Sequence, residues 1–122
     1  MTLDIVPLQT ERRMLVGEEL RLQFRLFDAD NRKPPDDLGP LRALVFHPGD
    51  GWQGQCWAHP MGNGLYEVRF PTPGAGSCYL FLACPKSGDG YAELPYLILQ
   101  TSDAGTTAIG RTPETAAAVH QC

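Results

Sequence analysis

The stretch Leu20-Arg21-Leu22-Gln23-Phe24-Arg25-Leu26 decides the fold class of this chain, because apolar and polar residues alternate strictly along it. Side chains of a β-strand point alternately to its two faces, so the pattern predicts a strand with one face in the core and the other in water. Tyr66 to Phe70 shows the same alternation. It follows Asn63-Gly64, which favours a tight turn because both residues tolerate positive φ. Both stretches therefore predict half-buried strands.

Further strand signals follow at intervals along the chain, with no amphipathic helix between them. Asp28 to Pro40 is rich in Asp, Asn, Pro and Gly and is predicted to be a loop. The spacing is typical of a sandwich of short strands, so we predict an all-β, immunoglobulin-like antiparallel β-sandwich of about seven strands. The additional strands are expected within Leu3 to Val16, Leu41 to His47, Trp52 to Ala58, Cys78 to Cys84 and Leu94 to Gln100.

Length and composition indicate one domain. The chain has 122 residues, of which 43% are hydrophobic and 20% charged, an ordinary globular balance. We expect the sandwich to occupy residues 1–100. Residues 101–122 hold few large apolar side chains and are predicted to form a flexible tail. That tail has the potential for a short helix, with Thr112 as its cap and Pro113 in its first turn.

The charge balance excludes some classes of partner. With ten Lys and Arg residues and a formal net charge of −4, the chain offers no basic face for nucleic acid. No apolar run has the length of a membrane span, so membrane insertion is not expected. The N-terminus lacks the pattern of a secretory signal. We therefore expect a cytoplasmic protein if Met1 is the native start. A periplasmic location follows instead if a leader has been removed or if a partner carries the chain out.

One short stretch concentrates candidate metal ligands. Cys56, His59 and Met61 lie within six residues of one another, and His47 is one hairpin away. Thiolate, imidazole and thioether groups select copper(I) or zinc, so these four residues are the candidate metal site. In the alternative interpretation, which we favour, Cys56 is a small apolar strand residue, His59 belongs to a turn and Met61 fills a gap. No cofactor other than copper or zinc is expected.

Four cysteines leave open the question of thiol chemistry. Cys78 and Cys84 lie roughly 20 Å apart along one strand, so they cannot form a disulfide with each other. Reduced thiols are our expectation in the absence of a secretory signal. A pair formed by Cys56 or Cys78 with a histidine is conceivable as a catalytic dyad, which keeps a thiol-dependent enzyme open as an alternative.

Four aromatic residues are candidates for an interface. Trp52 and Trp57 are an odd number of positions apart on one predicted strand and should point to opposite faces, so at least one is a candidate for exposure. Exposed aromatic side chains are common anchors of protein interfaces. With Tyr91 and Tyr96, they form the predicted interface set.

Several turn and strand motifs resemble those of bacterial immunoglobulin-like modules. They include Gly17-Glu18-Glu19 before the first clear strand, Gly62 to Val68, and Pro73-Gly74-Ala75-Gly76 before an aromatic strand. Their order is similar to that of the YtkA/FixH-like and CopC-like β-sandwiches. It looks most like the module appended to some YVTN-type and cytochrome d1-type β-propeller proteins, in which Gly51-Trp52-Gln53 and Leu94-Pro95-Tyr96-Leu97 would match a hairpin and a closing strand.

The resemblance implies an accessory or docking role in redox or metal-handling systems. We therefore predict a non-catalytic accessory subunit that binds a protein partner within a larger assembly. A redox system is one candidate for that assembly. The first alternative is a small copper- or zinc-binding module or chaperone. The second is the thiol-dependent enzyme.

Overall fold

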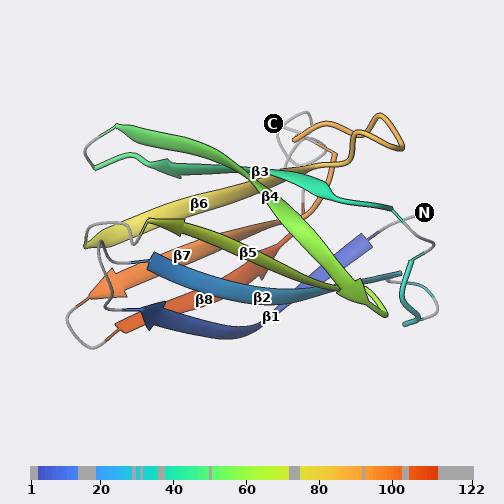
Figure 1. Ribbon diagram of the computed structural model, residues 1–122, viewed down its shortest axis with the longest axis horizontal. Helices are drawn as coiled ribbons and strands as arrows, with labels where there is room; N and C mark the ends of the chain where they lie inside the picture. The colour runs from blue at the N-terminus through green and yellow to red at the C-terminus, as the bar shows by residue number, and fades with distance from the viewer. Residues whose placement is uncertain are drawn as a thin grey trace, which may run out of the picture.

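The computed structural model shows an all-β protein (Figure 1). It describes residues 3–13, 19–28, 30, 32–35, 38–49, 51–71, 75–91, 93–102 and 105–112. Within these residues, every regular element is a strand and none is a helix. The strands are β1 (Leu3–Arg13), β2 (Glu19–Asp28), β3 (Leu41–His47), β4 (Trp52–Gly62), β5 (Leu65–Pro71), β6 (Gly76–Ala83), β7 (Tyr96–Ser102) and β8 (Gly105–Arg111).

All eight strands belong to one antiparallel sheet, in the order β1-β2-β5-β4-β3-β6-β7-β8. The long strand β4 joins the two halves of this sheet, as its diagonal course in Figure 1 shows. Its residues up to Ala58 pair with β3, and its residues from His59 onward pair with β5. We call β1, β2, β5 and the end of β4 the polar half. The start of β4 with β3, β6, β7 and β8 is the aromatic half.

A single core lies on the inner side of both halves. Its buried side chains come from alternate positions of the strands, as the two alternating sequences predict. Phe24 of β2 is fully buried, and its ring stacks on that of Tyr66 with centroids 5.6 Å apart. The two neighbouring strands that the sequence pattern identified most clearly, β2 and β5, therefore both contribute side chains to the core.

The two end strands of the sheet meet, which makes the fold nearly barrel-like. β1 and β8 lie against each other, although no ladder of hydrogen bonds joins them. Gly110 of β8 lies so close to Ile5 of β1 that a side-chain carbon at position 110 would collide with the Ile5 carbonyl oxygen. The absence of a side chain at Gly110 thus allows the sheet to curl until its ends touch.

The predicted strands and loop agree with the structure in most of their bounds. The turn at Asn63-Gly64 is confirmed, with φ angles of 55° and 78°. The loop after β2 is confirmed as well, since no strand lies between Asp28 and Leu41 in the described part of that segment. The predicted hairpin of β3 and β4 is closed by a hydrogen bond from the amide of Gly51 to the carbonyl of His47, at 2.9 Å.

The prediction of a flexible tail from residue 101 is wrong for the part of that segment that the structure describes. β7 continues to Ser102, and β8 pairs with it along its whole length. Inside the sheet, the hydroxyl oxygens of Thr101 and Thr106 lie 3.2 Å apart, and Ala108 packs against the core. Small residues are sufficient to form a strand here because β8 lies close to β1. With β8, the number of strands is eight rather than the predicted seven. The predicted helix beginning at Pro113 lies outside the described residues.

Candidate functional site

The outward side of the aromatic half carries an unusual number of large apolar side chains. In β3 and β6 the inward residues are buried, and the outward residues between them are mostly apolar too and half-buried. All eight described strands belong to the one sheet, so none of them is left to pack over this side. We call this outward surface the aromatic face. Its large apolar members are Leu44, Phe46, Trp57, Tyr79, Phe81, Tyr96, Ile98 and Ile109.

The strand register makes the aromatic face continuous. Phe46 of β3 lies opposite Tyr79 of β6, and Tyr79 lies opposite Ile98 of β7. The next outward residue of β6, Phe81, stacks with Tyr79 at 5.9 Å between ring centroids and contacts Tyr96 at 5.4 Å. Directly paired residues of antiparallel strands point to the same side of the sheet, so these side chains form one patch.

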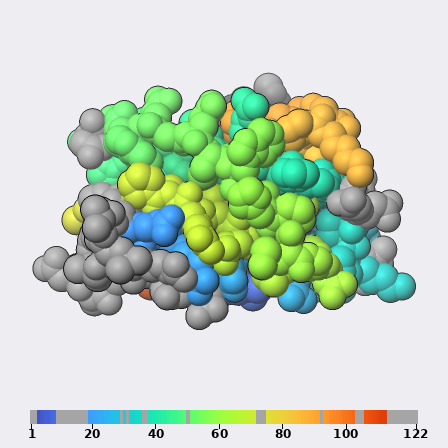
Figure 2. Space-filling view, viewed as in Figure 1, coloured from blue at the N-terminus to red at the C-terminus, as the bar shows by residue number. Residues whose placement is uncertain are grey.

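The charges on the aromatic face are of one sign. Its outward strand positions include Arg42 and Arg111 but no carboxylate and no lysine. The Arg42 guanidinium lies over the ring of Trp57, 5.2 Å from its centroid, which is within range of a cation–π interaction. Trp57 nevertheless remains 44% exposed. In Figure 2, the side chains of β4 form a diagonal band across the molecular surface.

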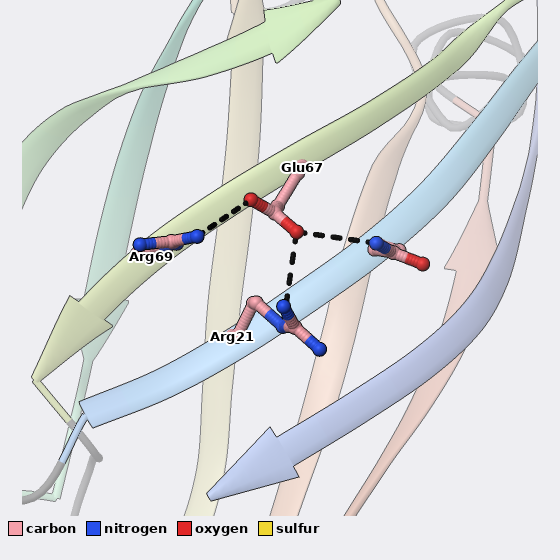
Figure 3. A network of polar contacts seen from close by, with 4 residues as sticks. Arg21, Glu67 and Arg69 are labelled. Atoms are coloured by element: carbon pink, nitrogen blue, oxygen red, sulfur yellow. Dashed lines mark hydrogen bonds and ion pairs between the residues drawn. The ribbon is translucent and has the colours of Figure 1, made fainter. Parts of the chain in front are cut away.

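The outward side of the polar half carries paired charges, together with the exposed side chains of Val6 and Leu8 on β1. The carboxylate of Glu67 on β5 accepts a hydrogen bond from the Gln23 amide at 3.1 Å and another from Arg69 at 3.2 Å (Figure 3). Arg21 adds an ion pair at 3.7 Å. Cross-strand pairs of opposite charge such as these are typical of a sheet face in contact with solvent. These paired charges have no counterpart among the outward strand residues of the aromatic face.

The network around Glu67 predicts an acid-sensitive contribution to stability. Burial by itself would raise the pKa of Glu67, but the hydrogen bond from Gln23 and the contacts with Arg69 and Arg21 together lower it below the ordinary value of 4.5. A carboxyl with a lowered pKa stabilises the fold above its unfolded-state pKa, and that contribution is lost as the pH falls through the folded-state pKa.

We therefore expect Glu67→Gln to be less stable than the wild type at neutral pH, by at most about 1 kcal/mol, because the arginine partners are partly exposed. The difference should shrink as the pH falls below the ordinary carboxyl pKa of 4.5 and through the lowered pKa of the folded state. Urea unfolding of both proteins across this pH range measures it. A constant difference at every pH would contradict the assigned role of Glu67.

The candidate metal ligands do not converge on one point. Cys56 faces the inner side of β4 and packs against the core, whereas His59 is exposed and lies on the outward side of the same strand. Met61 is 54% exposed near the irregular pairing that ends β4. His47 is buried, with its Nε2 atom 3.1 Å from the Ala75 carbonyl oxygen. Among the described residues, no group of three or more His, Cys, Asp or Glu side chains is placed to hold a metal ion.

The described cysteines are thiols in shielded positions. Cys78 and Cys84 are buried, and the Cys84 thiol donates a hydrogen bond to the Leu38 carbonyl at 3.3 Å. Burial raises the pKa of the Cys56 thiol, which lowers its thiolate fraction at neutral pH. Cys122 lies outside the described residues. None of the environments of Cys56, Cys78 and Cys84 resembles the electropositive, accessible setting of a reactive cysteine.

The structure separates the four predicted interface residues. Trp57 and Tyr96 belong to the aromatic face, while Trp52 points inward and packs against the core, so the two tryptophans do occupy opposite sides of β4. Tyr91 is half-buried in the segment between β6 and β7. Its hydroxyl oxygen is buried without a hydrogen-bond partner among the described residues.

Sequence reasoning missed most of the aromatic face, although a signal for it was present. The stretches that become β3 and β6 are apolar at consecutive positions, whereas β2 and β5 alternate strictly. Consecutive apolar residues indicate a strand that is covered on both sides. Here the inner side is covered by the core, and the outer side supplies Phe46, Tyr79 and Phe81.

Comparison with protein-family models, with curated proteins and with solved structures found no match for this chain. Within the described residues, no helix is long and apolar enough to cross a membrane.

Proposed function

We propose that this chain is a non-catalytic protein-interaction module with an immunoglobulin-like fold, which serves as an accessory subunit of a larger assembly. The aromatic face is its docking surface. The observation that carries the proposal is the contrast between the two outward surfaces, one charged and internally paired, the other apolar and without a described element over it.

The strand order supports the immunoglobulin-like part of the proposal. Immunoglobulin constant domains place strands A, B, E and D in one sheet and C, F and G in the other. The present order gives β1-β2-β5-β4 followed by β3-β6-β7, which corresponds to this arrangement when the strands are lettered in sequence. β8 extends the second sheet beside β7, and β4 continues from one sheet into the other.

The composition of the aromatic face supports a protein as the partner. The cores of protein interfaces are enriched in Trp, Tyr, Phe and Arg and depleted in Lys, Glu and Asp. The aromatic face has this composition, including Arg42 beside Trp57 at one margin. A patch of this kind left open to water also promotes aggregation, which gives the molecule a physical reason to keep it covered.

The state of the thiols supports a non-catalytic role. A nucleophilic cysteine requires a lowered pKa and a neighbouring base. The pKa of Cys56 is raised by burial, and His59 on the same strand points to the other side of the sheet. Cys56 is accordingly better explained as part of the packing against the core.

Site-specific photo-crosslinking in cells that produce the protein tests the proposal. A photoreactive amino acid at position 98, in the middle of the aromatic face, should give covalent adducts with protein. The same amino acid at position 25, which is exposed on the outward side of the polar half, should give few or none. Equal yields from the two positions, or no adducts from position 98, would contradict the proposed docking surface.

A further inference from the structure

We propose that the occupant of the aromatic face is a second copy of this chain, so that two aromatic halves stack face to face around a two-fold axis parallel to β6. This inference rests on the proposed docking role of that face. It adds the identity of the partner and the geometry of the contact.

The pattern of residues on the aromatic face has the symmetry that such a contact needs. β6 lies in the middle of the aromatic half, with β3 and β7 beside it and β4 and β8 at the margins. The neighbours of β6 on both sides present apolar residues, Phe46 on β3 and Ile98 on β7, in one row with Tyr79. The two marginal strands, β4 and β8, carry more polar outward residues than these central strands. A two-fold axis parallel to β6 places β3 over the partner's β7 and β4 over the partner's β8, so apolar strands meet apolar strands.

The two charged residues of the aromatic face, Arg42 on β3 and Arg111 on β8, are both positive, and neither lies on β6 beside the proposed axis. The aromatic face holds no carboxylate and no lysine, so two copies bring no buried negative charge together. Arg111 lies on β8, in the row of Tyr96, and the proposed axis brings it near the partner copy's β4. That strand presents Gln55 in the corresponding row, where its amide oxygen can accept a hydrogen bond from the Arg111 guanidinium of the other copy.

The extent of the aromatic face is close to the lower limit for a biological interface. Five strands spaced about 4.8 Å apart, with two to three outward residues each, cover on the order of 400 Å² in projection. Side-chain relief makes the accessible area larger than this projection. A biological interface buries at least about 500 Å² on each partner, and stable ones typically bury about 600–1,000 Å². Stacked sheets lie about 10 Å apart with interdigitated side chains. The face is therefore of the size that a small dimer interface uses.

Analytical ultracentrifugation of the purified full chain under reducing conditions tests the inference. We expect a reversible dimer of the 13.4 kDa chain at micromolar concentration. Phe81 lies on β6, next to the proposed axis, so Phe81→Glu places two carboxylates close together in the contact. This variant should raise the dissociation constant at least about 30-fold.

A charge-swap experiment tests the symmetry. Phe81→Lys alone should also be monomeric, and an equimolar mixture of Phe81→Glu and Phe81→Lys should recover a dimer that contains one copy of each. Val6→Glu is the matched control, because Val6 is 41% exposed on β1, in the polar half, and pairs with Arg25. It should leave the dimer intact. Circular dichroism confirms that each variant folds, and Ile98→Glu replaces Phe81→Glu if the latter does not.

The outcomes separate this inference from the proposed function. A monomeric wild type that forms crosslinks to a different protein from position 98 overturns the second copy as occupant and leaves the docking surface standing. A dimer that survives Phe81→Glu, or one that Val6→Glu dissociates, also overturns the inference, because the copies then meet elsewhere. A monomer without crosslinks from position 98 overturns both.

Discussion

Phe24→Ala is expected to lower the free energy of unfolding by about 3–5 kcal/mol, a large share of the total stability of a domain of this size. Phe24 is fully buried on β2, and its ring stacks on Tyr66 of the neighbouring strand. Truncation removes this contact and leaves a cavity in the middle of the core, where the surrounding strands are hydrogen-bonded on both sides and can relax only in part. Urea unfolding monitored by circular dichroism measures the loss.

Phe27→Ala is the matched control on the same strand. Phe27 is half-buried and faces the side opposite to Phe24, where its ring lies below the Arg32 guanidinium at 5.4 Å. Its loss should cost about 1 kcal/mol or less. Equal losses at the two positions would contradict the inward orientation of Phe24, and with it the register of β2.

Gly64→Ala is expected to destabilise the protein by about 2–5 kcal/mol through two separate effects. The φ angle of Gly64 is +78°, a left-handed conformation that costs a residue with a side chain about 1–2 kcal/mol. In addition, a side-chain carbon at this position would collide with the carbonyl oxygen of Leu26. That oxygen belongs to β2, whose Leu26 amide donates a hydrogen bond to the Gly64 carbonyl at 2.8 Å, so the backbone there has little freedom to move.

Gly51→Ala separates the two effects. Gly51 has a similar φ of +75°, but no described residue other than its chain neighbours has an atom within 4 Å of the place where its side-chain carbon would be. Its substitution should therefore cost only the conformational part, about 1–2 kcal/mol. Thermal or urea unfolding of both variants gives the difference. If Gly51→Ala proves as costly as Gly64→Ala, the close approach of the β4–β5 turn to β2 is not what makes position 64 sensitive.

Local sequence patterns predicted the strands that have one side in the core and the other in solvent. Alternation is visible in sequence because one side of β2 and β5 is in the core and the other carries charged partners such as Arg21 and Glu67. The Asn63-Gly64 turn was predictable for a similar reason, since positive φ angles restrict the choice of residue. β8 was not predictable in this way. Its small residues become structural only because β1 and β7 lie beside it.

For the candidate site residues too, sequence analysis predicted local properties better than spatial arrangement. Sequence analysis included Trp57 and Tyr96 in its predicted interface set because they are aromatic, and both side chains lie on the aromatic face. It grouped Cys56 with His59 because they are close along the chain. The three-residue step between them along a strand places them on opposite sides of the sheet, so closeness in sequence became separation in space.

The stretch from Leu20 to Leu26 determined by itself that this protein is a β protein with a half-buried strand, since its period of two is a property of consecutive residues. The tertiary structure alone decided the order of the strands, the inclusion of β8 and the union of Phe46, Tyr79, Phe81 and Ile98 in one aromatic face. These features depend on pairing between segments that are distant in the chain. Such pairing is set by how eight strands share one core, which no local pattern contains.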